Sequence, residues 1–98
     1  MASAKAALEC DTRALSWKLG EDKKIRINCV SPGPYASRAA KGIVNIEDLV
    51  ERAKEHSPLK RSISANDVAN SVLFMLSDLS KNITGETLYV DAGYHCSM

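Results

Sequence analysis

The chain has 98 residues, so it has room for one small domain and not for a multidomain enzyme. Hydrophobic residues make up 45% and charged residues 26% of it, a composition typical of globular proteins and not of disordered or collagen-like chains. The 13 basic residues barely exceed the 12 acidic ones, and the formal net charge is +1. We therefore expect neither nucleic acid nor a membrane as a partner, because an anionic partner draws a clustered positive excess.

The first part of the chain predicts a helix followed by a strand. Apolar or small side chains recur at helical spacing from Ala4 to Leu19, and Gly20 is a natural stop just past a helix. The run Ile25–Val30 is rich in β-branched residues and leads into the turn Pro32–Pro34. This pattern predicts a strand that runs into a loop.

The middle of the chain predicts two more helices. Apolar residues of Ile46–His56 share one helical face, and Asn45 stands where a capping residue would begin this helix. Further on, Ser64 precedes Asp67 by three residues, which resembles a capping box. Apolar residues at helical spacing follow it, so we predict a third helix that ends at about Ser77.

The last predicted element is a strand, Glu86–Asp91, which a glycine turn precedes. Two strands separated by helical segments indicate a parallel pair joined by a helical crossover. The predicted fold class is therefore α/β, with two strands and three helices of a doubly wound parallel sheet. Such a sheet buries both faces and normally has more than two strands, so we expect residues 1–98 to be the end of one domain, with the missing part before Met1.

Signals for metal sites, disulfides and membrane spans are absent from the sequence. Cys10, Cys29 and Cys96 form no C-x-x-C pair and no other zinc-binding spacing, which predicts reduced thiols and no metal site. No run approaches the ~20 apolar residues of a membrane span, and the N-terminal residues lack the apolar core of a secretory signal. A soluble intracellular protein is the expectation.

Three sequence blocks, taken together, carry a resemblance to a known family. They are Ala4–Glu9, Arg26–Pro34 and Ile83–Gly93. In this order they resemble the C-terminal portion of the short-chain dehydrogenase/reductase family, and the resemblance covers essentially all 98 residues. Within that family the chain looks most like the NADH-dependent enoyl-acyl-carrier-protein reductases of fatty-acid synthesis, on three features: Leu8-Glu9 after the lysine, Gly33-Pro34 followed by Ser37–Ala40, and the interval from Gly42 to Pro58.

The resemblance implies a Rossmann-like domain that binds NADH, with specific residues at the site. Lys5 matches the catalytic lysine that hydrogen-bonds the nicotinamide ribose. Residues implied to bind the cofactor are Lys5 and the loop residues Gly33, Pro34, Tyr35, Ala36, Ser37, Arg38 and Ala39. The backbone at the start of this loop would meet the nicotinamide carboxamide, and its end would approach the phosphates. Residues implied to contact the acyl substrate are Tyr35, Ala39, Ile43 and Ile46.

The family's active-site tyrosine is expected to lie outside this chain. In most members it stands four residues before the lysine, where this sequence has Met1, and in the enoyl reductases six residues separate the two. The N-terminal half with the glycine-rich pyrophosphate turn is also expected to be missing. We therefore expect residues 1–98 alone to be inactive. The resemblance also implies that the full-length enzyme is a homo-oligomer, a tetramer, that acts on acyl-carrier-protein-linked enoyl substrates. The expected location is the cytoplasm, or the plastid stroma in a plastid-bearing cell.

Two alternatives stay open at this point. The chain could belong to another short-chain dehydrogenase with a ketoacyl or alcohol substrate, or it could be a truncated product without catalytic activity that acts by association. Neither His56 nor His95 has an acidic partner that the sequence reveals, so both are predicted to be surface or packing residues. Trp17 is predicted to be a core or subunit-interface residue.

Overall fold

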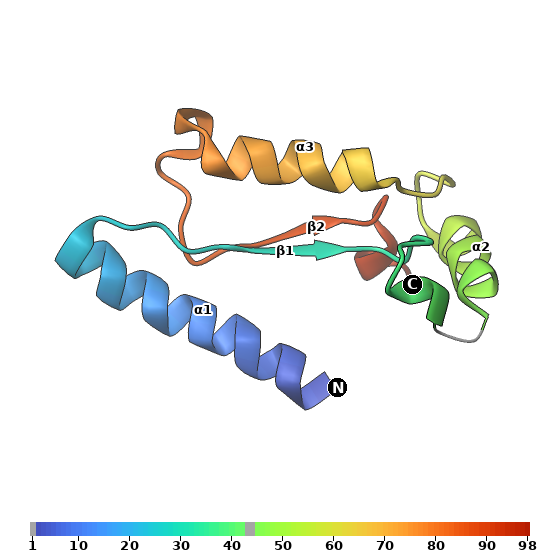
Figure 1. The fold of residues 1–98 in the computed structure, drawn as a ribbon, viewed down its shortest axis with the longest axis horizontal. Helices are drawn as coiled ribbons and strands as arrows, with labels where there is room; N and C mark the ends of the chain where they lie inside the picture. The colour runs from blue at the N-terminus through green and yellow to red at the C-terminus, as the bar shows by residue number, and fades with distance from the viewer. Residues whose placement is uncertain (1, 43–44) are drawn as a thin grey trace. The chain divides into compact units, whose positions relative to one another are not determined.

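The computed structural model describes residues 2–42 and 45–98 (Figure 1). Met1 and Ile43 therefore lie outside the described residues. The helices and strands are α1 (Ala2–Lys23), β1 (Cys29–Pro32), α2 (Ile46–His56), α3 (Ala65–Leu76) and β2 (Thr87–Val90). Three short 3-10 turns accompany them: η1 (Ala40–Gly42), η2 (Asp78–Ser80) and η3 (Tyr94–Cys96).

The two strands pair side by side in a parallel sheet (Figure 1). The amide of Cys29 donates to the carbonyl of Glu86 at 2.8 Å, and the amide of Gly33 donates to that of Val90 at 3.0 Å. Donor and acceptor advance by four residues in the same direction, which is the register of parallel strands. The predicted α/β class and the parallel pair are thus confirmed.

The chain divides into two compact units, which are described separately. Unit 1 consists of residues 1–30 and 73–88, and unit 2 of residues 31–72 and 89–98. In unit 1, α1 lies on one side of the strands and the last turn of α3 on the other (Figure 1).

The predicted stop of the first helix at Gly20 is wrong. Helix α1 continues through Gly20 to Lys23, and the next residue, Lys24, has the left-handed φ of 58° that commonly ends helices. The amide of Ile25 then donates back to the carbonyl of Leu19 at 3.2 Å. Lys24 adopts the left-handed conformation that glycine usually adopts after the last residue of a helix, and for this reason the sequence pattern placed the end of the helix too early.

The first strand begins later than predicted, at Cys29 and not at Ile25, because side chains bridge the preceding residues to the partner segment. Asn28 donates from Nδ2 to the carbonyl of Ile83 at 3.0 Å and accepts from the amide of Glu86 at 2.9 Å. Arg26 donates to carbonyls at the C-terminal end of α3 and beyond it: Met75 at 2.8 Å, Ile83 at 3.0 Å and Ser77 at 3.5 Å. A guanidinium at this end also complements the negative pole of the helix.

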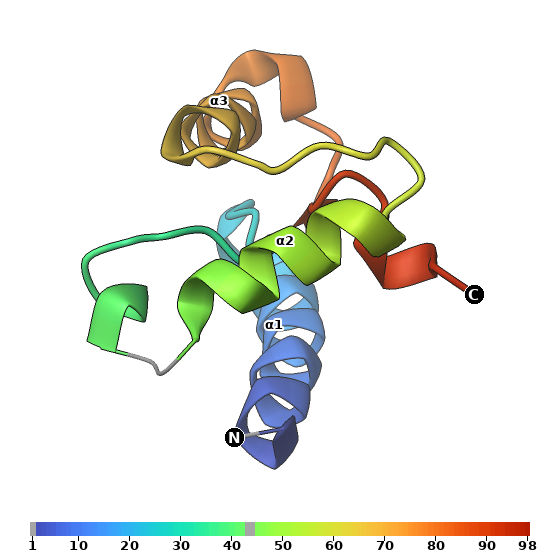
Figure 2. The ribbon, with the colours of Figure 1, turned by 90° about the vertical axis from the view of Figure 1, so that its right-hand side faces the viewer.

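Unit 2 contains α2, whose predicted bounds, Ile46–His56, are confirmed. The predicted cap is wrong: Asn45 has a left-handed φ of 66°, and its side chain makes no capping hydrogen bond. Ile46 is only 5% exposed and anchors the start of the helix in unit 2. The turn η3 packs against α2 near the C-terminal end of that helix (Figure 2).

The predicted capping box at the start of α3 is confirmed. The amide of Ser64 donates to Oδ2 of Asp67 at 2.7 Å, and the amide of Asp67 donates to Oγ of Ser64 at 3.3 Å. Two backbone donors that a helix start leaves free are thereby satisfied. The chemistry is local, which is why the sequence alone could locate it.

Few large apolar side chains are buried in the described part of the chain. Only Ile46 and Met75 are buried hydrophobic residues, whereas Trp17 is 77% exposed and so is not a core residue. Other half-exposed or exposed apolar side chains of unit 1 are Leu8, Leu15, Ile25, Leu73, Leu76 and Leu79. Among the described helices, none is long and apolar enough to cross a membrane.

Candidate functional site

The carboxyl ends of both strands meet in unit 2, where open parallel sheets bind ligands. Gly33 directly follows β1, and Asp91 directly follows β2. A Cβ atom built on Gly33 would lie 3.0 Å from Cβ and 3.2 Å from Cα of Asp91. Both distances are shorter than ordinary carbon contacts of about 3.5–4.0 Å. Glycine at position 33 therefore lets the exit of β1 lie directly on Asp91.

The segment from Pro34 to Ala39 continues from this contact as an open loop. The amide of Ser37 donates to the carbonyl of Tyr35 at 2.8 Å, and the Ser37 hydroxyl accepts from the amide of Ala40 at 3.0 Å. Ser37 thus caps the short turn η1, a structural task beside the expected approach to phosphates. Tyr35 and Ser37 are half-buried, whereas Arg38 and Ala39 are exposed.

The donor groups of this loop fit an anionic dinucleotide. Among the described residues, the backbone amides at positions 35, 36, 38 and 39 donate no hydrogen bond. The exposed guanidinium of Arg38 adds a positive charge beside them. Amide donors with a guanidinium suit phosphate and carboxamide oxygens, which only accept hydrogen bonds. These residues therefore fit the chemistry of a nicotinamide dinucleotide.

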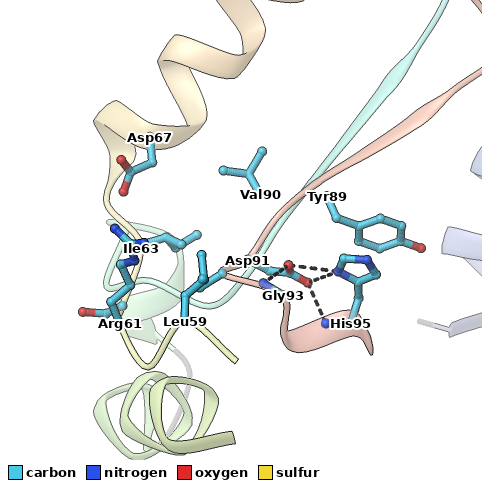
Figure 3. Close-up of a pocket in the computed structure, with 11 residues that line it drawn as sticks. Leu59, Arg61, Ile63, Asp67, Tyr89, Val90, Asp91, Gly93 and His95 are labelled. Atoms are coloured by element: carbon cyan, nitrogen blue, oxygen red, sulfur yellow. Dashed lines mark hydrogen bonds and ion pairs between the residues drawn. The ribbon is translucent and has the colours of Figure 1, made fainter. Parts of the chain in front are cut away.

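A cluster of Asp91, His95 and Tyr89 stands at the end of β2 (Figure 3). Nδ1 of His95 lies 3.0 Å from each carboxylate oxygen of Asp91. The Asp91 carboxylate also accepts from the amide of Gly93 at 3.0 Å and from the amide of His95 at 2.9 Å. The imidazole ring stacks on the Tyr89 ring, with centroids 4.0 Å apart and planes 9° from parallel. The cluster holds one carboxylate in a fixed orientation.

The pKa of Asp91 is lowered by this environment. Burial alone would raise the pKa, since it disfavours a charged carboxylate. Hydrogen bonds from the His95 ring and from the amides of His95 and Gly93 outweigh burial and favour the ionised form. Asp91 is thus held as a carboxylate, although its side chain is only 7% exposed.

The turn after Asp91 adopts a left-handed backbone at two consecutive residues. Ala92 has φ of 57° and Gly93 has φ of 88°. A Cβ atom on Gly93 would clash with Cγ and Cδ of Pro58, so only glycine fits there. The amide of Leu59 donates to the carbonyl of Ala92 at 3.3 Å and ties this turn to the loop after α2.

A cavity of about 410 Å³ adjoins the cluster in unit 2 (Figure 3). Its apolar wall includes Leu59, Ile63 and Val90, and its charged wall includes Arg61 and Asp67. None of the residues expected to bind the cofactor lines it. A much smaller cavity, of about 10 Å³, adjoins Gly33 and Pro34. The large cavity and the cofactor loop are therefore different features of unit 2.

The remaining residues expected at the site lie in different places. Lys5 is an exposed residue of α1 in unit 1, whereas the loop Gly33–Ala39 belongs to unit 2. Ile46 is buried at the start of α2, and Ile43 lies outside the described residues. No cluster of His, Cys, Asp and Glu in the described ranges could hold a metal ion.

The two histidines differ in their surroundings. His56 is exposed and its ring contacts the carbonyl of Arg52 at 2.8 Å, which confirms the prediction of a surface residue. For His95 the expectation of no acidic partner is wrong, because Asp91 pairs with it. The spacing Asp-x-Gly-x-His is the signal that sequence reasoning missed, since a turn at the glycine folds residue 95 back onto residue 91.

Comparison with known proteins gives one matching family profile, described as "Enoyl-(Acyl carrier protein) reductase", which spans residues 1–95. A chloroplastic enoyl-[acyl-carrier-protein] reductase [NADH] 2 of rice is 48% identical over 95% of this chain, which spans 25% of the rice protein. An enoyl-[acyl-carrier-protein] reductase [NADPH] of Staphylococcus aureus is 39% identical over 97% of this chain, which spans 37% of that protein. The chain thus spans roughly a quarter to a third of these relatives.

The similarity extends to solved structures. The crystal structure of the Plasmodium berghei enoyl-acyl-carrier-protein reductase with triclosan matches with a TM-score of 0.94 and 42% identity. The match covers 100% of this chain and 34% of that one. The α/β arrangement described above is therefore also found, as a part, in that larger structure.

Proposed function

Because this chain belongs to the enoyl-(acyl carrier protein) reductase family, we propose that it is part of an enzyme that reduces trans-2-enoyl thioesters in fatty-acid biosynthesis. The observation that supports this most is the family match over residues 1–95, which includes Lys5 and the whole cofactor loop. The open donor groups of that loop support it independently. The substrate is carried on acyl carrier protein, and the cofactor is NADH.

The chain's own residues bind and orient in this reaction. Lys5 donates from Nζ to the ribose hydroxyls of the cofactor, and its positive charge favours the ionised form of the family's tyrosine. Gly33, Pro34 and Tyr35 present the loop backbone to the carboxamide. Residues Ala36 to Ala39 present amides and one guanidinium to the phosphates. When bound, NADH would supply the hydride for the β-carbon of the enoyl thioester. The resulting enolate would then take up a proton at its α-carbon.

The acyl chain contacts apolar side chains in the loop Gly33–Ala39 and after it. Tyr35 and Ala39 lie in the loop, Ile46 is the first residue of α2, and Ile43 precedes it in the sequence. Recognition of an acyl chain rests on apolar area with few polar anchors. The half-buried ring of Tyr35 is the described side chain best suited to stack beside such a chain.

The 98 residues act as the C-terminal part of a single short-chain dehydrogenase/reductase domain and are inactive alone. Two observations support this. The chain spans 25% of the rice relative, and Leu8, Leu15 and Leu76 of unit 1 are at least half exposed, as expected of helices meant to pack on a larger sheet. The complete enzyme is a homotetramer, located in the cytoplasm or in the plastid stroma.

The experiment that tests this function is a chimaera with the rice relative. The matched segment of the rice enzyme is replaced by this chain, and the loss of NADH absorbance is followed with a trans-2-enoyl-acyl-carrier-protein substrate. We expect the rate of reduction to fall on the order of 100-fold in the Lys5→Met variant, because the donor to the cofactor ribose and the positive charge that favours the ionised tyrosine are both lost. The Lys18→Met variant, with the same change on the exposed part of α1, is the matched control. A folded chimaera that neither binds NADH nor reduces the substrate would contradict the proposal.

A further inference from the structure

The loop Gly33–Ala39 begins at a close contact between the two strand ends. Gly33 is the first residue after β1, and a Cβ atom on it would lie 3.0 Å from Cβ and 3.2 Å from Cα of Asp91, so any side chain there would have to displace Asp91. The amide of Gly33 also donates to the carbonyl of Val90, the residue before Asp91. The backbone position of Asp91 therefore sets where the loop leaves the sheet.

Three hydrogen-bond donors fix the carboxylate of Asp91. Its carboxylate accepts from two backbone amides and from the imidazole of His95, and its side chain is 7% exposed. The His95 ring is itself held flat against the ring of Tyr89. Figure 3 shows the contacts from the Tyr89 ring through His95 to Asp91. The close approach of Asp91 to Gly33 continues them to the loop entrance, all within unit 2.

We propose that Asp91 and His95 are positioning residues for the cofactor loop Gly33–Ala39. His95 holds the Asp91 carboxylate, and the fixed Asp91 backbone holds the loop entrance in the conformation that presents its free amides. This role rests on the proposed function, because it assigns the loop to a nicotinamide dinucleotide. Neither residue touches the cofactor: both act through Gly33.

Two features of the cluster favour this role over simple stabilisation of the chain end. Asp91, the covered member of the cluster, lies directly against the loop entrance, whereas His95 and the residues after it are exposed. The turn at Ala92 also adopts a left-handed backbone in a residue that has a Cβ atom, a strained conformation that persists only where surrounding contacts impose it. The contacts that impose it are those of Asp91 with Gly93 and His95, and that of Ala92 with Leu59.

The two properties of His95 can be separated by a pair of substitutions in the rice chimaera. His95→Phe keeps a ring to stack on Tyr89 but removes the donor to Asp91. His95→Asn removes the ring but keeps an N–H donor at the place of Nδ1. His56→Phe is the matched control, because His56 is exposed on α2 and its ring nitrogen pairs with the carbonyl of Arg52 in its own helix.

The first readout is the dissociation constant of NADH, measured by fluorescence titration. We expect about a tenfold weaker affinity in His95→Phe, since a hydrogen bond to a charged group is lost, and values within about twofold of the parent in His95→Asn and His56→Phe. In steady-state assays the change should appear in the KM for NADH with kcat nearly unchanged, because the loop entrance and not the reacting atoms is disturbed. Equal affinities in all variants would overturn the proposal.

The second readout needs no cofactor. Amide hydrogen exchange of the cofactor-free chimaera should be faster at Gly33 and Ser37, whose amides are hydrogen-bonded to Val90 and Tyr35, in His95→Phe than in the parent, and unchanged in His56→Phe. A purely structural role would lower the melting temperature of His95→Phe without changing exchange at the loop, and that result would also overturn the proposal. A parent that binds no NADH, but in which exchange at Gly33 still responds to His95, would contradict the proposed function and leave the coupling in place.

Discussion

The close approach of Gly33 to Asp91 makes Gly33→Ala a sharp test of the loop's geometry. Gly33 does not have a left-handed φ, so the substitution strains no backbone angle, and its whole effect comes from the added methyl group. That methyl would lie 3.0 Å from Cβ and 3.2 Å from Cα of Asp91, and 3.7 Å from the Ile63 side chain. The Cα atom of Asp91 belongs to the backbone and has no rotamer to change. The hydrogen bond from the Gly33 amide to the Val90 carbonyl also holds the two strand ends together.

The magnitude follows from this geometry. Inserting one methyl group into a packed contact costs about 1–3 kcal/mol, and the nearness of a backbone atom places Gly33→Ala in the upper half of that range. The substitution also displaces the loop, so NADH should bind more weakly. If the same energy is lost from binding, the dissociation constant should rise by about tenfold or more. Gly42→Ala is the matched control, because a Cβ atom there meets nothing within 4 Å.

The assay compares melting temperature and NADH dissociation constant in the rice chimaera carrying either substitution. Gly33→Ala should melt several degrees lower and bind NADH weakly, and Gly42→Ala should match the parent in both. If Gly33→Ala binds NADH as the parent does, the loop does not present the cofactor-binding amides in the way described, and the reasoning fails.

Three further predictions concern the elements around the site. Gly93→Ala should destabilise the chimaera by about 3 kcal/mol, because it adds left-handed strain and a clash with Pro58, and hydrogen exchange at the Leu59 amide should report the local opening. Hydrogen bonds from Ser64 lower the pKa of Asp67, and the bond from the Ser64 amide has a larger effect than that from its hydroxyl. The ionised Asp67 carboxylate therefore stabilises the fold above its ordinary pKa of 3.8, and this stabilisation is lost as pH falls through the lowered pKa. Acid titration of helix content should show this loss in the parent and not in Asp67→Asn. Arg26→Met should cost about 2–3 kcal/mol in urea unfolding, because charged donors to the end of α3 disappear, and an unchanged midpoint would contradict the capping role.

Elements with local causes were predicted well from the sequence. The bounds of α2 follow from the periodic apolar face between Asn45 and Ser57, and the capping box joins Ser64 to Asp67 within four residues. The order of helices and strands and the parallel pairing were also predictable, because crossover connections leave few topologies. In such cases the residues that decide the structure are close together in the chain.

Elements with distant causes were predicted less well. The start of β1 is decided by Asn28, whose partners are Ile83 and Glu86, more than fifty residues away. Helix α1 ends where Lys24 adopts a left-handed backbone conformation, which a lysine in the sequence does not predict.

The candidate site shows the same division. The loop Gly33–Ala39 could be predicted from a strand that runs into Pro-Gly-Pro, but the reason for glycine at position 33 is its contact with Asp91 at the other strand end. The partner of His95 was missed because the pairing depends on the left-handed turn at Ala92 and Gly93. Hydrophobic periodicity does not indicate that turn, and the spacing Asp-x-Gly-x-His is the sequence signal that does.

The measurement that tests the central claim most directly is the intact mass of the native product from its source cells. An antibody raised against residues 64–98 captures the product, and mass spectrometry measures it. Our account, in which these residues complete a larger reductase domain, predicts a product much heavier than 10.6 kDa. A native product of 10.6 kDa, with no larger form, would contradict it.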